Sequence, residues 1–176
     1  VLTTISPRQR FEHGATYDSG RSRVVVFGGL DSGRMADTWE YDGTRWIQRT
    51  PATNPPARSV CGLAYDRRRG RTVLFGGVSA TGGMLGDHWE WDGTNWFPVT
   101  PANAPSARHG HGMIGNPARN RVVLFAGLAG STPQSDLWEW DGTNWTQVNA
   151  SNAPPTRGLH AFGYDYDRGR LLVHGG

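Results

Sequence analysis

A ten-residue phrase occurs three times in this chain of 176 residues, as DTWEYDGTRW at 37–46, DHWEWDGTNW at 87–96 and DLWEWDGTNW at 136–145. The copies lie about fifty residues apart, a spacing typical of repeat proteins. Each copy contains two tryptophans seven positions apart, namely Trp39 and Trp46, Trp89 and Trp96, and Trp138 and Trp145. Because each unit of a repeat protein packs on its neighbours, the fifty-residue period limits the possible folds more strongly than any local sequence pattern does.

Two further landmarks repeat in the same frame. A Pro-x-x-Arg phrase opens each unit and places an arginine at Arg10, Arg58, Arg108 and Arg157. A doublet of small residues follows each arginine at one fixed spacing, namely Gly28-Gly29, Gly76-Gly77, Ala126-Gly127 and Gly175-Gly176. The chain therefore divides into units at 7–54, 55–104 and 105–153, and a partial unit at 154–176, within one array over 1–176.

The second unit shows which strands we expect. Residues 58–66 and 72–77 are short runs of small, β-branched and aromatic residues around a charged turn, and they predict two strands, a and b. The repeated phrase predicts strands c and d, joined by the tight reversal that Asp92-Gly93 favours. The Pro-rich stretch at 100–108 fits neither a helix nor an interior strand. Each unit is thus expected to form four antiparallel strands and no helix.

The paired tryptophans are interpreted mainly as architecture. A small four-stranded sheet cannot bury its faces alone, and large indole rings give it apolar area for packing on its neighbours. A sugar-stacking surface is the alternative interpretation of the same rings.

Composition and motifs exclude several classes of protein. The net charge of +3 is too small to favour nucleic-acid binding, and no apolar run is long enough to span a membrane. Cys61 is the single cysteine, so no intrachain disulfide can form. The sequence contains no nucleophilic serine motif and no phosphate-binding glycine loop. We therefore expect no cofactor and no metal.

Units of this length, with a glycine doublet after the second strand and a spaced aromatic pair on the outer two, resemble the kelch repeat. The resemblance extends from Pro7 to Gly176, and the Trp-Glu-Trp-Asp-Gly and Pro-x-x-Arg phrases are similar to those of bacterial members. It implies an all-β fold of β-propeller blades, three four-stranded and half of a fourth, around a central channel. We favour a secreted or cell-surface location in a bacterium.

Three and a half blades do not close a ring, and two explanations stay open. The chain is either part of a longer propeller, or a second copy completes the circle in a homo-oligomer. Residues 1–6 match only the end of a strand d, which in a dimer would lie beside the other copy's strand b. The third unit departs from the pattern at Ala126 and at Gly115-Asn116, where the other units have Gly and Tyr-Asp. We therefore expect a looser inner hairpin in that unit.

The four repeated arginines are the first candidates for ligand binding. Equivalent residues of a propeller form a ring around the axis, so Arg10, Arg58, Arg108 and Arg157 are expected near one mouth of the channel. The resemblance implies that arginines at this point grip carboxylates of acidic peptides, and guanidinium groups suit bidentate contacts of this kind. The other interpretation, which the recurrence in every unit favours, is a structural arginine that ties strand a to loop carbonyls of a neighbouring blade.

Three histidines follow those arginines at the same spacing, at His13, His111 and His160, and Cys61 stands at the matching place in the second unit. Imidazoles on neighbouring blades could bind a ligand or a metal. Packing or hydrogen bonding within the fold is the other interpretation, and it is favoured because no carboxylate or closely spaced ligand pair accompanies them.

Two other recurring sets, the arginines of the a–b turns and the acidic residues near strand c, are not interpreted as binding or catalytic sites. The arginines of the a–b turns, at 67–71 and 119–121, are expected to be solvated. Acidic residues recur in every full unit, at Asp37, Asp87, Asp136, Glu40, Glu90 and Glu139. Paired carboxylates can act as acid and base, but an active site is normally built once, so the recurrence favours structural contacts.

The leading functional hypothesis is a non-catalytic binding module. The b–c loops at 30–36, 78–86 and 128–135 differ in length and composition while the frame stays fixed, as expected when loops on a rigid scaffold carry specificity. The partner would be a protein, an acidic peptide or a glycan. The alternatives are a propeller enzyme, either an oxidoreductase similar to galactose oxidase or a sugar isomerase, and a purely structural surface-array protein.

Overall fold

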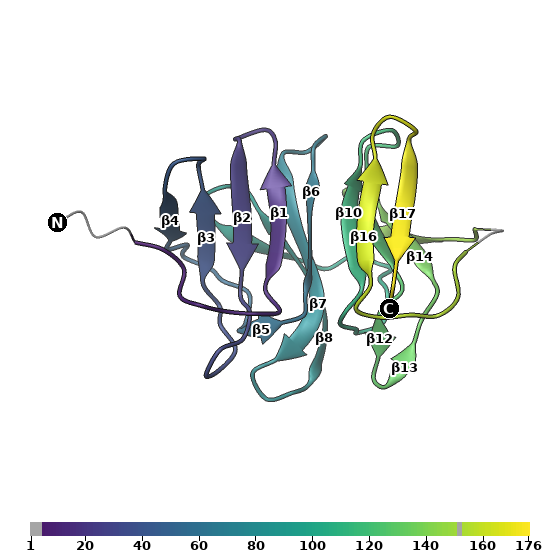
Figure 1. Ribbon diagram of the computed structural model, residues 1–176, viewed down its shortest axis with the longest axis horizontal. Coiled ribbons are helices and arrows are strands. Elements are labelled where there is room, and N and C mark those ends of the chain that lie inside the picture. The colour runs from purple at the N-terminus through teal and green to yellow at the C-terminus, as the bar shows by residue number, and fades with distance from the viewer. Residues whose placement is uncertain (1–4, 151–152) are drawn as a thin grey trace.

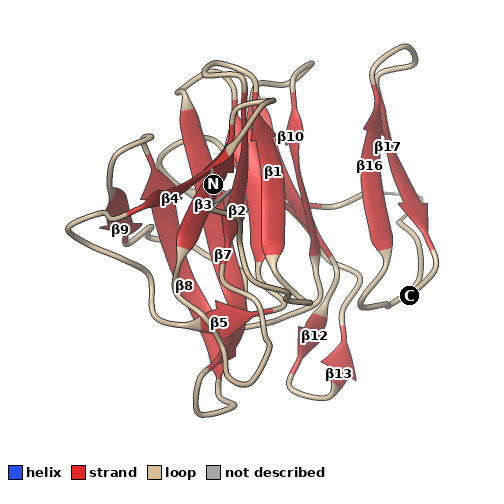
Figure 2. Cartoon of the chain, turned by 60° about the vertical axis from the view of Figure 1, so that its left-hand side comes forward, coloured by secondary structure: helices blue, strands red, loops and turns tan. Residues whose placement is uncertain are grey.

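The computed structural model describes residues 5–150 and 153–176, and these residues form strands, turns and loops (Figure 1). Antiparallel sheets of four, five and four strands follow one another along the chain, a small two-stranded sheet branches from the third of them, and another two-stranded sheet comes last (Figure 2). The prediction of an all-β chain with three full kelch-like blades and half of a fourth is confirmed. Within the described residues, no helix is long and apolar enough to cross a membrane.

The first blade contains the strands in simple sequential order. They are β1 (Gly14–Asp18), β2 (Arg23–Phe27), β3 (Thr38–Tyr41) and β4 (Trp46–Arg49). The sequence predicted that segment 1–6 matches the end of a strand d. Residues 1–4 lie outside the described residues, and Ile5 and Ser6 belong to no strand.

The second blade repeats this order with longer middle strands. It consists of β6 (Gly62–Asp66), β7 (Arg71–Ser79), β8 (Met84–Trp91) and β9 (Trp96–Val99), and the short β5 (Arg58–Ser59) pairs with the far end of β7. The β7–β8 pairing shifts register between Phe75 and Gly77 and then continues into the b–c loop. This loop is therefore an extension of the sheet.

The third blade consists of β10 (Gly112–Asn116), β11 (Arg121–Phe125), β14 (Leu137–Trp140) and β15 (Trp145–Val148). Its b–c loop forms a separate small hairpin of β12 (Leu128–Ala129) and β13 (Thr132–Pro133). The half-blade is the pair β16 (Ala161–Asp165) and β17 (Arg170–His174).

The expectation of a looser inner hairpin in the third blade is wrong. Strands β10 and β11 pair over five positions, from Gly112 opposite Phe125 to Asn116 opposite Arg121, as the inner hairpins of the first two blades do. Ala126 adopts the left-handed backbone conformation (φ 58°) that glycine has at the equivalent Gly28 (φ 65°). The turn is thus kept, although left-handed geometry is unfavourable for alanine.

The inner strands β1, β6, β10 and β16 lie side by side, and the outer strands extend away from them (Figure 1). The a–b turns lie at one edge of the array, at the top of Figure 1, and antiparallel pairing puts the c–d turns at the same end of the strands; we call this the turn edge. The b–c loops and the crossovers between blades lie at the opposite edge, which we call the loop edge. The fold therefore offers two separate surfaces around the axis.

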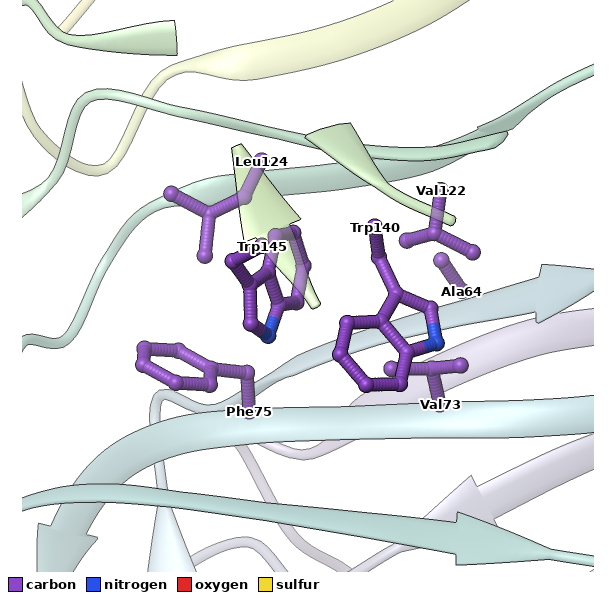
Figure 3. Close-up of a cluster of buried hydrophobic side chains, with 7 residues drawn as sticks. All are labelled: Ala64, Val73, Phe75, Val122, Leu124, Trp140 and Trp145. Atoms are coloured by element: carbon purple, nitrogen blue, oxygen red, sulfur yellow. The ribbon is translucent and has the colours of Figure 1, made fainter. Parts of the chain in front are cut away.

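Tryptophans of the repeated phrase fill the space between blades. Trp140 and Trp145 of the third blade pack on Val73 and Phe75 of the second, as Figure 3 shows. Trp91 and Trp96 occupy the equivalent place between the second blade and the first. All four indoles are at most 1% exposed. Burial of such large rings is the main apolar contribution to blade stacking.

Each of these four indole N–H groups donates to an acceptor on the preceding blade. The Nε1 atom of Trp91 donates to Glu40 at 2.9 Å, and that of Trp140 donates to Glu90 at 3.2 Å. Trp96 donates to the Thr38 hydroxyl in the same way. The recurring Glu residues are therefore structural, as the sequence predicted.

Arginines neutralise the buried carboxylates. Glu40 is fully buried and accepts hydrogen bonds from Arg21 at 2.6 Å and from Arg49 at 2.7 Å. Burial alone raises the pKa of Glu40, but the hydrogen bonds from Trp91, Arg21 and Arg49 outweigh it and lower the pKa. The carboxylate thus stays ionised between the blades.

Replacement of a single inter-blade indole is expected to destabilise the array. Trp96→Ala removes a fully buried ring and should lower the free energy of unfolding by about 3–5 kcal/mol in urea denaturation. Phe97→Ala, one residue further along β9, is the control, because its side chain is 44% exposed and its loss should cost less than half as much. Similar losses for both variants would contradict the role assigned to the indole.

Candidate functional site

The repeated arginines lie at the loop edge, with guanidinium groups that face into their own blades. Arg58 is fully buried and binds both carboxylate oxygens of Asp87, at 2.6 and 2.7 Å. It also donates to the carbonyl oxygens of Gly76 and Pro56. These contacts join the start of strand a to strands b and c of the same blade.

The same arrangement recurs in the first and third blades. Arg108 binds Asp136 and the Ala126 carbonyl oxygen, and Arg10 binds Asp37 and the Gly28 carbonyl oxygen. Burial raises the pKa of each aspartate, and the bonds from its arginine and from the nearby tryptophan more than compensate and lower it. A ligand carboxylate would have to displace an aspartate from each of these three arginines.

Arg157 of the half-blade differs from the other three. It is partly exposed and donates to the carbonyl oxygens of Gly175 and Pro155. No carboxylate pairs with it among the residues that the structure describes. Of the four predicted arginines, Arg157 is therefore the one whose guanidinium group is accessible without the loss of an ion pair.

A chain of backbone hydrogen bonds links the starts of the inner strands. The amide of Val60 donates to Glu12, that of Gly110 to Val60, and that of Leu159 to Gly110, at 2.7–3.2 Å. All four residues have positive φ angles between 55° and 61°, although only one is glycine. This strained backbone is repeated in every blade and fixes the loop-edge end of the channel.

The candidate histidines pack between inner strands and do not converge on one point. His111 lies over Gly62 of the preceding blade and edge-on to Phe75, and His160 lies over Gly112 and edge-on to Phe125. His13 is exposed before β1. Among the described residues, no group of three His, Cys, Asp or Glu side chains is placed to hold a metal ion.

Burial keeps His111 uncharged. Desolvation, with smaller contributions from Arg108, His109 and His160, lowers the pKa of His111 to about 3. Neither imidazole nitrogen has a hydrogen-bond partner within the described part of the chain. Protonation of this ring therefore opposes folding.

Acid should weaken the array through His111. Because its pKa falls from 6.5 in the unfolded chain to about 3 in the fold, its stabilising effect is complete above pH 6.5 and is lost as the pH falls toward 3. Between pH 7.5 and pH 5 the loss amounts to about 2 kcal/mol. His111→Cys, which copies Cys61 of the second blade, should reduce the pH dependence of urea unfolding by that amount. An unchanged pH profile would show that the fold does not lower the pKa of His111.

The turn edge contains a cavity that the sequence did not reveal. It has a volume of about 450 Å³, and its walls include Tyr17, Tyr65 and Tyr166. Arg67, Arg68 and Arg121 also line it. These arginines were expected to be solvated, and Arg67 and Arg68 are indeed exposed. The departure from the repeat at Gly115 was the one signal that pointed here, since Gly115 is also part of the wall.

Comparison with known proteins agrees with the architecture. The chain matches the KLHDC2/KLHL20/DRC7 Kelch-repeats domain over residues 2–176. No curated protein gave a match. The glycine doublets, the four-stranded sheets and the tryptophan-filled spaces between them account for this similarity in physical terms. The chain therefore belongs to the kelch-repeat family, whose propeller domains generally act as protein-interaction modules.

Proposed function

We propose that the chain is a non-catalytic interaction module that binds its partner protein at the loop edge. The observation that carries this proposal is the diversity of the b–c loops on a uniform frame. Loop 78–86 extends a long hairpin, and loop 128–135 forms the β12–β13 hairpin. Loop 30–36 has only isolated bridges, from Leu30 to Arg34 and to Phe11. Scaffolds that vary only in their loops usually bind through them.

The charge of this edge favours an acidic segment of the partner. A hollow of about 570 Å³ beside the first blade is lined by Arg8, Arg34, Met35 and Trp39, among other residues. Neither Arg8 nor Arg34 pairs with a carboxylate in the described ranges, and Arg157 adds a further accessible guanidinium group at the same edge. Arginine, methionine and tryptophan are enriched in protein interfaces.

The chemistry of Cys61 disfavours the enzymatic alternative. Burial raises the pKa of this thiol to about 11, so it is protonated and unreactive at neutral pH. Cys61 also lies on the same inner segment as Tyr65, directly before β6. In an oxidoreductase similar to galactose oxidase, a linked cysteine and tyrosine would have to reach one copper ion from different places in the fold.

Completion of the ring by a second copy, or by further chain, is part of the same proposal. Leu172 of the half-blade is 54% exposed, whereas the equivalent Val73 and Val123 are fully buried. Trp46 is half-exposed, whereas the equivalent Trp96 is buried. The outer faces of the half-blade and of the first blade therefore carry the same kinds of apolar side chain that are buried between neighbouring blades. The mass of the particle in solution distinguishes a closed oligomer from a single chain.

Peptide and glycan arrays test the ligand class and the surface together. Acidic peptides should bind the chain, and the affinity of the best of them should fall at least tenfold in the double variant Arg8→Ala, Arg34→Ala, measured by fluorescence anisotropy. The double variant Arg45→Ala, Arg170→Ala loses the same charge elsewhere and should bind normally.

Equal affinity in all variants would place the peptide site away from the loop edge. Specific glycan binding in the absence of peptide binding would indicate that the partner is a carbohydrate and not a protein.

A further inference from the structure

The cavity at the turn edge has the lining expected of a second binding site. It opens at the ends of β1, β6 and β10 and is walled by tyrosine rings, Ile114 and Pro117. Tyr17 is 57% exposed and Tyr166 is 75% exposed. Aromatic rings that stay exposed around a concave surface on rigid strands are typical of ligand sites. Their phenol groups can also donate hydrogen bonds to a ligand.

The repeat itself explains the position of the cavity. Tyr17, Tyr65 and Tyr164 occupy equivalent positions on inner strands, and the third blade has Gly115 there. Tyr65 extends toward the a–b turn of the first blade, where its hydroxyl group lies beside Gly20. A tyrosine at position 115 would extend in the same way over the turn that contains Arg67 and Arg68. Its absence leaves that space open.

Close approach of the inner strands excludes a side chain at this position. A Cβ atom on Gly115 would lie 2.5 Å from the carbonyl oxygen of Tyr65. The third blade could therefore carry the tyrosine only if β6 and β10 moved apart. The open space is thus fixed by the packing of the blades.

Free guanidinium groups surround the opening. In the turn 67–70, Arg69 pairs with Asp66 and Glu90, whereas Arg67 and Arg68 have no carboxylate partner among the described residues. Arg121 donates to the carbonyl oxygen of Asn120. The rim can therefore accept several carboxylates without the loss of an ion pair.

Two polar side chains in the wall of the cavity are already hydrogen-bonded to the a–b turns. Asn116 accepts a hydrogen bond from the amide of Arg119, and Asp66 accepts one from the amide of Arg69. The arginines at the rim, Arg67, Arg68 and Arg121, favour a ligand that carries carboxylates over a neutral sugar. A ligand with an apolar side chain among the tyrosines and carboxylates at the rim therefore fits the cavity better than a neutral sugar does.

We propose that the turn edge binds a short acidic peptide segment, with one aromatic or aliphatic side chain seated among Tyr17, Tyr65 and Ile114, and with neighbouring carboxylates paired to Arg67, Arg68 and Arg121. This site lies at the opposite edge of the array from the loop-edge surface. The two can therefore be occupied independently, and either can fail while the other stands.

Fluorescence anisotropy with a labelled Asp-Glu-Phe-Glu-Asp peptide tests the site in the full chain. The peptide should bind saturably, and more weakly as salt concentration rises. Affinity should fall at least tenfold in the double variant Arg67→Ala, Arg68→Ala and severalfold in Tyr166→Ala. These residues are exposed, so both variants should keep the unfolding profile of the parent chain.

Matched controls separate this site from the loop edge and from charge alone. The double variants Arg45→Ala, Arg170→Ala and Arg8→Ala, Arg34→Ala should bind the peptide as the parent chain does. The peptides Asn-Gln-Phe-Gln-Asn and Asp-Glu-Gly-Glu-Asp should bind at least tenfold more weakly.

Three results would overturn the proposal. They are the absence of saturable binding, equal affinity in the Arg67→Ala, Arg68→Ala variant, and tighter binding of an oligogalacturonate than of the acidic peptide. The last result would assign the site to acidic carbohydrate. Weaker binding in the Arg8→Ala, Arg34→Ala variant alone would move the peptide to the loop edge.

Discussion

An indole N–H that is buried between two sheets needs an acceptor on the opposite sheet, and this requirement organises the array. A buried donor without a partner costs more than the hydrogen bond itself contributes. The acceptor for Trp91 is the carboxylate of Glu40, which is itself buried and would be costly without cations. Arg21 and Arg49 supply the positive charge. One repeated tryptophan thus explains a repeated glutamate and the arginines around it.

The loop edge of each four-strand blade is stabilised by a second ionic contact. The bidentate pair of Arg58 and Asp87 joins three strands of one blade, and Trp89 donates a further hydrogen bond to the same aspartate. Arginine suits this position better than lysine because its planar group binds both oxygens and a carbonyl at once. Since these contacts complete the frame, the loops and turns beyond them are free to differ between blades. Both candidate binding surfaces lie in those variable parts.

Much of the fold could be predicted from the sequence, because the repeat marks each strand several times. The phrase around Asp92-Gly93 placed strands c and d, and the doublets placed the end of strand b in the first and third blades, whereas β7 continues through Gly76-Gly77 to Ser79. The expectation for the third blade was wrong, since Ala126 tolerates the backbone angle that glycine has elsewhere. The orientation of Arg58 could not be predicted, because spacing alone does not show whether a side chain faces the channel or its own blade.

The turn-edge cavity was beyond sequence reasoning for a related reason. The exchange of tyrosine for Gly115 is visible in the repeat, but its consequence depends on the distance between β6 and β10. That distance is set by side chains from both blades, among them Met113, which packs on Gly62. A departure from a repeat therefore indicates the position of a possible site, but the packing of the neighbouring strands determines whether a cavity forms there.

A double-mutant cycle on Trp91 and Glu40 tests the central interaction most directly. Urea unfolding of Trp91→Phe, Glu40→Leu and the double variant isolates the coupling between two residues on different blades. A hydrogen bond to a buried carboxylate predicts a coupling free energy of about 1.5–3 kcal/mol. A coupling below about 0.3 kcal/mol would show that the two side chains act independently, and would contradict the organisation of the blades around this contact.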